Sequence, residues 1–189
     1  ASFKSKVLPI NKWIFERSKF TKNFDPLEIL IERAKQQDIL IVATIDPFSL
    51  AETNENPFIK QKLYVKEKGF IRINYESKQA NEILLRSVKE LVSHYKINGL
   101  LMTNLIDNNE YKITGNLISN VYKTVKQIDQ TLSVGLKINE DNIIEKLDYD
   151  FTKLIIKNTD YFVVDMKLSV ENGYENYIKK WSEICDEYN

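Results

Sequence analysis

Apolar positions along the chain follow two alternating patterns, one helical and one extended. In FDPLEILIERAKQQ they recur at the i, i+3, i+4 and i+7 spacing of a one-sided amphipathic helix. These positions are Leu27, Leu30, Ile31 and Ala34. Asp25 suits the N-cap, Pro26 the first helical position, and Glu28 completes a capping box. The run ILIVATI at residues 39–45 then lacks polar alternation and ends at Asp46, which is typical of a strand buried on both faces of a parallel sheet.

The same order of helix and strand repeats along the chain. Helical patterns cover residues 80–95, 117–128, 151–156 and 174–181, and apolar strand runs cover residues 100–104, 132–138 and 161–166. Alternating helices and strands imply right-handed crossovers and a parallel sheet. The sequence therefore predicts an α/β fold: a partial or reduced (β/α) TIM-type barrel with four parallel strands in sequential order.

One segment, residues 62–75 (KLYVKEKGFIRINY), interrupts this rhythm and predicts an inserted β-hairpin that turns near Lys68-Gly69. Between Lys60 and Lys78 the chain has six basic and two acidic residues, with three aromatic residues interleaved. A nucleic-acid surface can combine basic and aromatic side chains in this way. A solvated hairpin over a barrel mouth is the favoured interpretation, and nucleic acid is disfavoured as a partner.

Composition narrows the class of protein further. The 189 residues suit one domain, 1–189, and 43% hydrophobic residues suffice for a core. Positive and negative charges balance at 27 each, so no net field attracts nucleic acid or anionic membrane, and no apolar run is long enough to span a membrane. A single cysteine, Cys185, and a single histidine, His94, disfavour disulfides, metal clusters and histidine-based triads. With only five glycines and no phosphate-binding loop, no cofactor is predicted.

Several stretches resemble the bacterial glycoside-hydrolase-like proteins related to family ten, which are often surface lipoproteins. FDPLEILIERAKQQDILIVATIDPF is similar to that family's helix and third strand, SVKELVSHYKINGLL to the helix and fourth strand, and DYFVVDMKLS to the sixth strand. The resemblance implies an eightfold β/α barrel of which this chain holds strands three to six. It also implies an extracytoplasmic or cell-surface location, with carbohydrate or other segments of a larger protein as partners. The chain is therefore expected to be a fragment of a larger protein or a reduced barrel.

The chain departs from the family at the strand ends where barrel enzymes place their chemistry. Thr103 and Asn104 stand where the fourth strand of the family carries paired aspartates. Glu140 lies in the altered ending of the fifth strand, and Asp165 in that of the sixth. Glycoside hydrolysis normally needs two carboxyl groups, about 5 Å apart for retention or about 6.5–9.5 Å apart for inversion. The resemblance therefore predicts a kept scaffold with degenerate catalytic positions.

Three carboxylates remain as candidate catalytic residues: Asp46, Glu140 and Asp165. Asp46 also suits a structural role as the cap of the turn that follows its strand, and this role is favoured. The candidate ligand-binding residues are Thr103, Asn104, Asp46 and Lys137. No metal site is predicted.

Lys137 and Asp165 each interrupt an otherwise apolar strand, and the two strands should be neighbours. A buried lysine is costly unless it is paired, so a structural ion pair between them is the favoured interpretation. A lysine on a barrel strand can also form a Schiff base, as in aldolase-type enzymes.

Three functions therefore remain open. The favoured one is a non-catalytic binding or structural module of a larger surface protein. The alternatives are an active carbohydrate hydrolase with relocated carboxylates and a lysine-dependent aldolase-type barrel enzyme.

Overall fold

The structure is a computed structural model that describes residues 3–9, 25–46, 55–67, 70–105, 111–139 and 149–165, together with residues 179, 182, 183 and 186. The side chains at positions 67, 70, 111–113, 139, 149 and 165 lie outside this description. So do most residues of the final helix predicted at residues 174–181, as well as Cys185.

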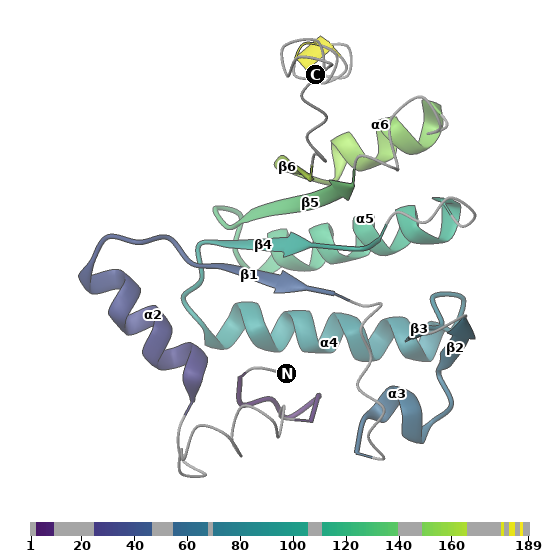
Figure 1. Cartoon of the computed structure of the whole chain (residues 1–189), viewed down its shortest axis with the longest axis horizontal. Helices are drawn as coiled ribbons and strands as arrows, with labels where there is room; N and C mark the ends of the chain where they lie inside the picture. Colours follow the sequence, from purple (N-terminus) through teal and green to yellow (C-terminus); the bar gives the residue numbers. More distant parts are fainter. Residues whose placement is uncertain are drawn as a thin grey trace.

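A parallel sheet of four strands forms the centre of the fold (Figure 1). Its strands are β1 (Val42–Ile45), β4 (Gly99–Met102), β5 (Ser133–Asn139) and β6 (Tyr161–Asp165). They pair side by side in the order β1-β4-β5-β6, and each pair is parallel. This confirms the predicted order of strands and the α/β class.

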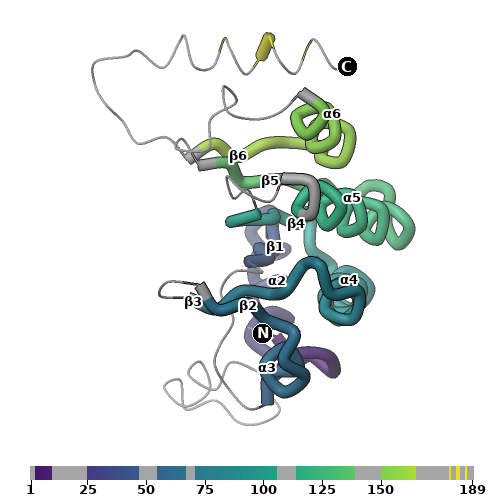
Figure 2. Tube along the Cα trace, turned by 90° about the vertical axis from the view of Figure 1, so that its right-hand side faces the viewer, coloured from purple at the N-terminus to yellow at the C-terminus, as the bar shows by residue number. Residues whose placement is uncertain are grey.

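One face of the sheet is covered by the helices that connect its strands. Figure 2 shows α4 (Lys78–His94), α5 (Tyr111–Ile128) and α6 (Tyr149–Lys157) along the same side of the sheet. The strand side chains buried in the core include Leu100, Met102, Val134, Leu136 and Ile138. They pack with apolar residues of the helices in one continuous cluster. The unbroken apolar runs of β4 and β5 thus supply the core, as their pattern predicts.

The opposite face of the sheet is more open. Strand geometry turns every second side chain to this face, where Thr44 and Val42 of β1 are exposed. The expectation that residues 39–45 form a strand buried on both faces is therefore wrong for this strand: β1 begins only at Val42 and alternates between exposed and half-buried positions. The physical reason is that β1 lies at the edge of the described sheet, with helices packed on one face alone.

The predicted first helix is present as α2 (Pro26–Gln36). Asp25 caps it, because its carboxylate accepts the backbone N–H groups of Leu27 and Glu28. The prediction that one apolar face of α2 is buried is only partly correct, because Ala34 is buried but Leu30 is 53% exposed. The described chain offers this helix too little apolar surface to cover the whole stripe.

The predicted insert is confirmed as an antiparallel hairpin of β2 (Tyr64–Glu67) and β3 (Phe70–Ile73). The short helix that precedes it, α3 (Pro57–Lys60), was not predicted.

Within the hairpin region the basic and aromatic side chains are not all on the surface. Arg72 is buried, donates to the carbonyl of Ile73, and lies over the ring of the buried Tyr75. These two side chains therefore belong to the packing of the hairpin.

Candidate functional site

Polar side chains meet where β1 and β4 end. The side-chain amide of Asn104 donates to the carboxylate of Asp46, with 2.8 Å between Nδ2 and Oδ2. Thr103 is only 8% exposed, and its backbone N–H and its hydroxyl both donate to the carbonyl of Ile45, at 3.0 and 3.2 Å. The structure thus brings together three of the predicted site residues. Thr103 holds the two strand ends to each other, whereas Asn104 and Asp46 form the polar pair above them.

The backbone of Asn104 has an unusual conformation that makes this contact. Its φ is 56°, in the left-handed region that asparagine adopts more readily than most residues other than glycine. The turn lies between the buried Thr103 and the buried Leu105. Asn104 itself remains exposed and directs its amide across to the neighbouring strand end. The sequence indicated the position of this residue but not its conformation.

The remaining predicted residues belong to β5 and β6. The register pairs Lys137 with Val163 and Asn139 with Asp165, which places Lys137 and Asp165 two positions apart on the same face of the sheet. Lys137 is half-buried there. The side chain of Asp165 lies outside the described part of the chain, so the ion pair with Lys137 stays a prediction. Glu140 also lies outside it.

Ionisable groups with shifted pKa values gather at the other end of the sheet, where the strands begin. Asp160 precedes β6 and binds the ammonium group of Lys126 at 2.8 Å. Burial opposes ionisation of Asp160, but hydrogen bonds from Lys126 and from the N–H of Val134 outweigh it and hold the pKa of this carboxyl below its usual value. Burial, and then the charge of Asp160, raises the pKa of Tyr122 and of Tyr161. In barrels this end of the sheet serves stability, so these shifts mark a structural cluster.

His94 is the last residue of α4, and its ring nitrogen lies 2.9 Å from the carbonyl oxygen of Glu90. Among the described residues no group of three or more potential metal ligands comes together. No helix in the same part of the chain is long and apolar enough to cross a bilayer.

Parallel strands linked by helices on one face, with polar side chains collected at the strand ends, define part of a (β/α) barrel. Solved structures with this arrangement include glycoside hydrolases. A protein described as a sporulation-specific glycosylase, ydhD from Bacillus subtilis, aligns with 89% of this chain at a TM-score of 0.58 and 14% identity. A GH27 β-L-arabinopyranosidase from Geobacillus stearothermophilus aligns with 86% of it, at 0.57 and 10% identity. The α-amylase of Geobacillus thermoleovorans, solved with acarbose, aligns with 72% at 0.52 and 14% identity.

These likenesses show that the chain has a glycoside-hydrolase-like fold. The aligned region spans 55% of the glycosylase, 40% of the arabinopyranosidase and 33% of the amylase. No protein-family model matches the sequence, and no curated protein sequence matches it.

Proposed function

We propose that this chain is a glycoside-hydrolase-like domain, related to the family-ten-like bacterial proteins, that serves as a non-catalytic binding or structural module of a larger surface protein. The contact between Asn104 and Asp46 carries the proposal. In the resembling family, the position of Asn104 carries an aspartate. Here an amide occupies that position and donates to a carboxylate, so the pair is built to hold hydroxyl-bearing ligands rather than to shuttle protons.

The position of Thr103 supports the same conclusion. By the resemblance, Thr103 stands where the family has the other aspartate of the pair. Its backbone N–H and its hydroxyl both donate to the carbonyl of Ile45. A neutral hydroxyl in this buried place joins two strands and has no acid or base function near neutral pH. With Thr103 and Asn104 at the positions of the family's aspartates, Asp46 is the carboxylate that the described residues provide at the ends of β1 and β4.

Hydrolysis assays test this proposal directly. Purified protein should not hydrolyse α-linked or β-linked aryl glycosides and oligosaccharides at any pH between acidic and neutral. If wild type is active and an Asp46→Asn or Asp165→Asn variant is inactive, the carboxylates have been relocated and the domain is a working hydrolase. If borohydride together with a carbonyl substrate traps Lys137 covalently, the aldolase-type alternative is correct.

A binding assay completes the test. Saccharides that bind at the ends of β1 and β4 should shift the side-chain amide signal of Asn104 in a nitrogen-15 NMR titration. The Asn104→Gly variant should weaken this binding because glycine lacks the amide that bridges to Asp46. It should keep the fold because glycine readily adopts the left-handed backbone of this position. A control variant, Asp38→Asn, changes an exposed turn residue that also has a positive φ, and it should bind like wild type.

Exposed apolar residues near the free edge of β1 support the proposal that the chain belongs to a larger barrel. Leu40 is 73% exposed and Val42 46% exposed, and Leu30 of α2 is also exposed. A parallel sheet edge with apolar side chains around it favours pairing with a further strand. A Leu40→Glu variant should therefore aggregate less and bind less apolar dye than the wild-type chain, because the substitution removes apolar surface beside β1. The matched control is Ile128→Glu on α5, which replaces a 36%-exposed isoleucine away from this edge; equal effects of the two variants would count against the proposal.

A further inference from the structure

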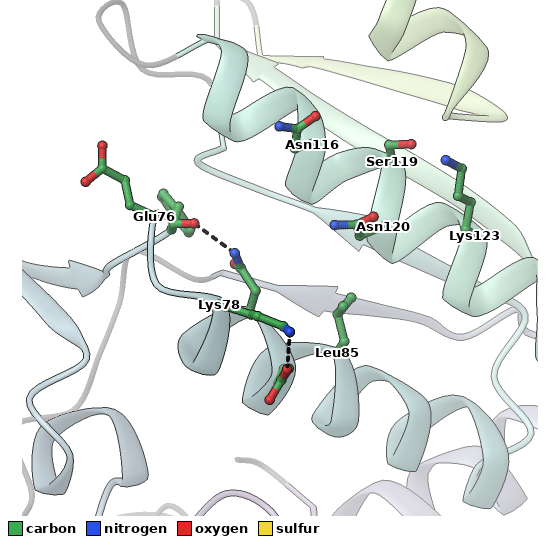
Figure 3. Close-up of a pocket in the computed structure, with 10 residues that line it drawn as sticks. Glu76, Lys78, Leu85, Asn116, Ser119, Asn120 and Lys123 are labelled. Atoms are coloured by element: carbon green, nitrogen blue, oxygen red, sulfur yellow. Dashed lines mark hydrogen bonds and ion pairs between the residues drawn. The ribbon is translucent and has the colours of Figure 1, made fainter.

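A groove of about 550 Å³ lies between the first half of α4 and the middle of α5, separate from the strand ends (Figure 3). Each helix lines it with a stripe of residues at the i, i+3, i+4 and i+7 spacing, so that each stripe keeps to one side of its helix. The stripe of α4 consists of Lys78, Asn81, Glu82 and Leu85, and that of α5 of Asn116, Ser119, Asn120 and Lys123. The buried residues of both helices face the sheet instead.

The lining of the groove is rich in groups that both donate and accept hydrogen bonds. Asn116, Ser119 and Asn120 follow one another along α5, across from Leu85 of α4, as Figure 3 shows. Each asparagine offers one carbonyl and one NH₂ group side by side, an arrangement that matches two neighbouring hydroxyl groups of a ligand. Asparagine inside a helix is less favourable than alanine. Stability of α5 therefore does not explain two asparagines on this stripe.

The charges of the groove balance one another. Lys78 and Glu82 are paired on α4 with 4.0 Å between their charged atoms. Glu76 lies toward one end of the groove and Lys123 toward the other, as Figure 3 shows. With two cations and two anions in the lining, no net charge selects a phosphate or a polyamine. The lining therefore fits a neutral ligand.

Asn81 forms part of the wall of the groove. Its Nδ2 donates to the carbonyl of Tyr75 at 2.8 Å, while its buried Oδ1 has no hydrogen-bond partner among the described residues. Because this oxygen is buried, a ligand in the groove does not reach it, and Asn81 shapes the wall of the groove without contacting the ligand. Tyr75 itself is buried and offers no exposed ring for stacking, so binding rests on hydrogen bonds and should be weak.

We propose that the groove between α4 and α5 binds a neutral polyhydroxylated ligand, a sugar or short oligosaccharide, held by the amides of Asn116 and Asn120. This site is distinct from the strand ends and does not require the function proposed for them.

The test is a nitrogen-15 NMR titration of the full chain with maltotriose and, separately, with cellotriose. The side-chain NH₂ signals of Asn116 and Asn120 should shift in a saturable way. Replacing one of the two asparagines by alanine should weaken binding about fivefold, and replacing both should weaken it about thirtyfold, since each neutral hydrogen bond contributes about 1 kcal/mol. Alanine is the better helix former, so these variants keep α5 intact.

Two controls separate the site from its surroundings. Gln127→Ala removes an exposed amide of the same helix outside the groove and should leave the affinity unchanged. Asp46→Asn alters the strand-end site and should also leave the shifts of Asn116 and Asn120 unchanged, so the two sites succeed or fail independently. The proposal is overturned if neither saccharide shifts these two signals, if the double alanine variant binds as tightly as wild type, or if inorganic phosphate or a short neutral peptide produces the same shifts.

Discussion

Asp160 joins three elements at the amino end of the sheet, and its removal should destabilise the fold. Its Oδ2 accepts the N–H of Val134 at 2.7 Å and the ammonium group of Lys126 at 2.8 Å. Its Oδ1 accepts the hydroxyl of Tyr122 at 3.3 Å. One carboxylate thus ties the loop before β6 to the start of β5 and to α5. Lys126 is also held by the carbonyl of Leu132 at 3.0 Å.

The expected cost follows from the two charged hydrogen bonds. Bonds to charged groups contribute about 1.5–3 kcal/mol each when buried, and partial exposure reduces this contribution. The side chains of Lys126 and Asp160 are 22% and 31% exposed. Asp160→Ala should therefore lower the free energy of unfolding by about 2–3 kcal/mol, or the melting temperature by about 5–10 °C. Asp160→Asn keeps an acceptor for the N–H of Val134 and should cost about half as much.

Urea unfolding followed by circular dichroism measures these changes, and a double-mutant cycle with Lys126→Met should show a coupling of about 1 kcal/mol. Because the folded pKa of Asp160 is lowered, its contribution is present above the ordinary aspartate pKa of about 3.9 and is lost as the pH falls toward the lower folded value. The difference between wild type and Asp160→Asn should therefore shrink below about pH 4. A loss under about 0.5 kcal/mol for Asp160→Ala, the size of an ordinary surface substitution, would refute this account of the cluster.

Three further predictions concern other parts of the fold. Burial, and then a hydrogen bond to Asp25, raises the pKa of Tyr95. Wild type should therefore lose stability as the pH rises above the ordinary tyrosine pKa of about 10. A Tyr95→Phe variant should lose less stability over the same pH range in urea titrations. Gly135→Ala places a Cβ 2.3 Å from the ring of Tyr161 and should cost about 1–3 kcal/mol, a penalty that should disappear in a Tyr161→Ala background. Lys137→Met and Asp165→Leu should each destabilise the protein while the double variant recovers; strictly additive effects would show that these residues do not pair.

Strand order and most helices could be predicted because their patterns depend on local sequence and on a single shared core. Val134, Leu136 and Ile138 form one face of β5, and all three are buried under α5 and its neighbours as expected. The hairpin was predictable for the same reason, since two short apolar runs flank a turn. The failures lie in α2 and at the start of β1, where Leu30, Ile39, Leu40 and Val42 are exposed. Periodicity identifies an apolar face but does not say whether another element is present to cover it.

The candidate site was predictable in position and not in geometry. The apolar run at residues 100–104 placed Thr103 and Asn104 at the end of a strand, and the resemblance to the family marked that end as the place of its aspartates. The direction of the Thr103 hydroxyl toward Ile45 and the left-handed backbone of Asn104 depend on contacts between residues about 58 positions apart in the sequence. The polar stripes of α4 and α5 were missed because only apolar spacing was counted. Counting asparagine and serine at the same helical spacing would have found the stripe of α5.

The two ends of the sheet differ in how their polar groups are used, and this difference bears on the proposed role. At the amino ends, Asp160 is fixed by three donors, including a full positive charge, which is the arrangement of a structural clamp. At the carboxyl ends, Asp46 accepts the neutral amide of Asn104, an exposed residue with a strained backbone. Strain of this kind costs about 1 kcal/mol or more and persists only where the surrounding structure enforces it. A domain that keeps such a residue at the exposed end of its strands, above a core held firmly from the other end, fits the proposed role, in which these polar groups face a ligand.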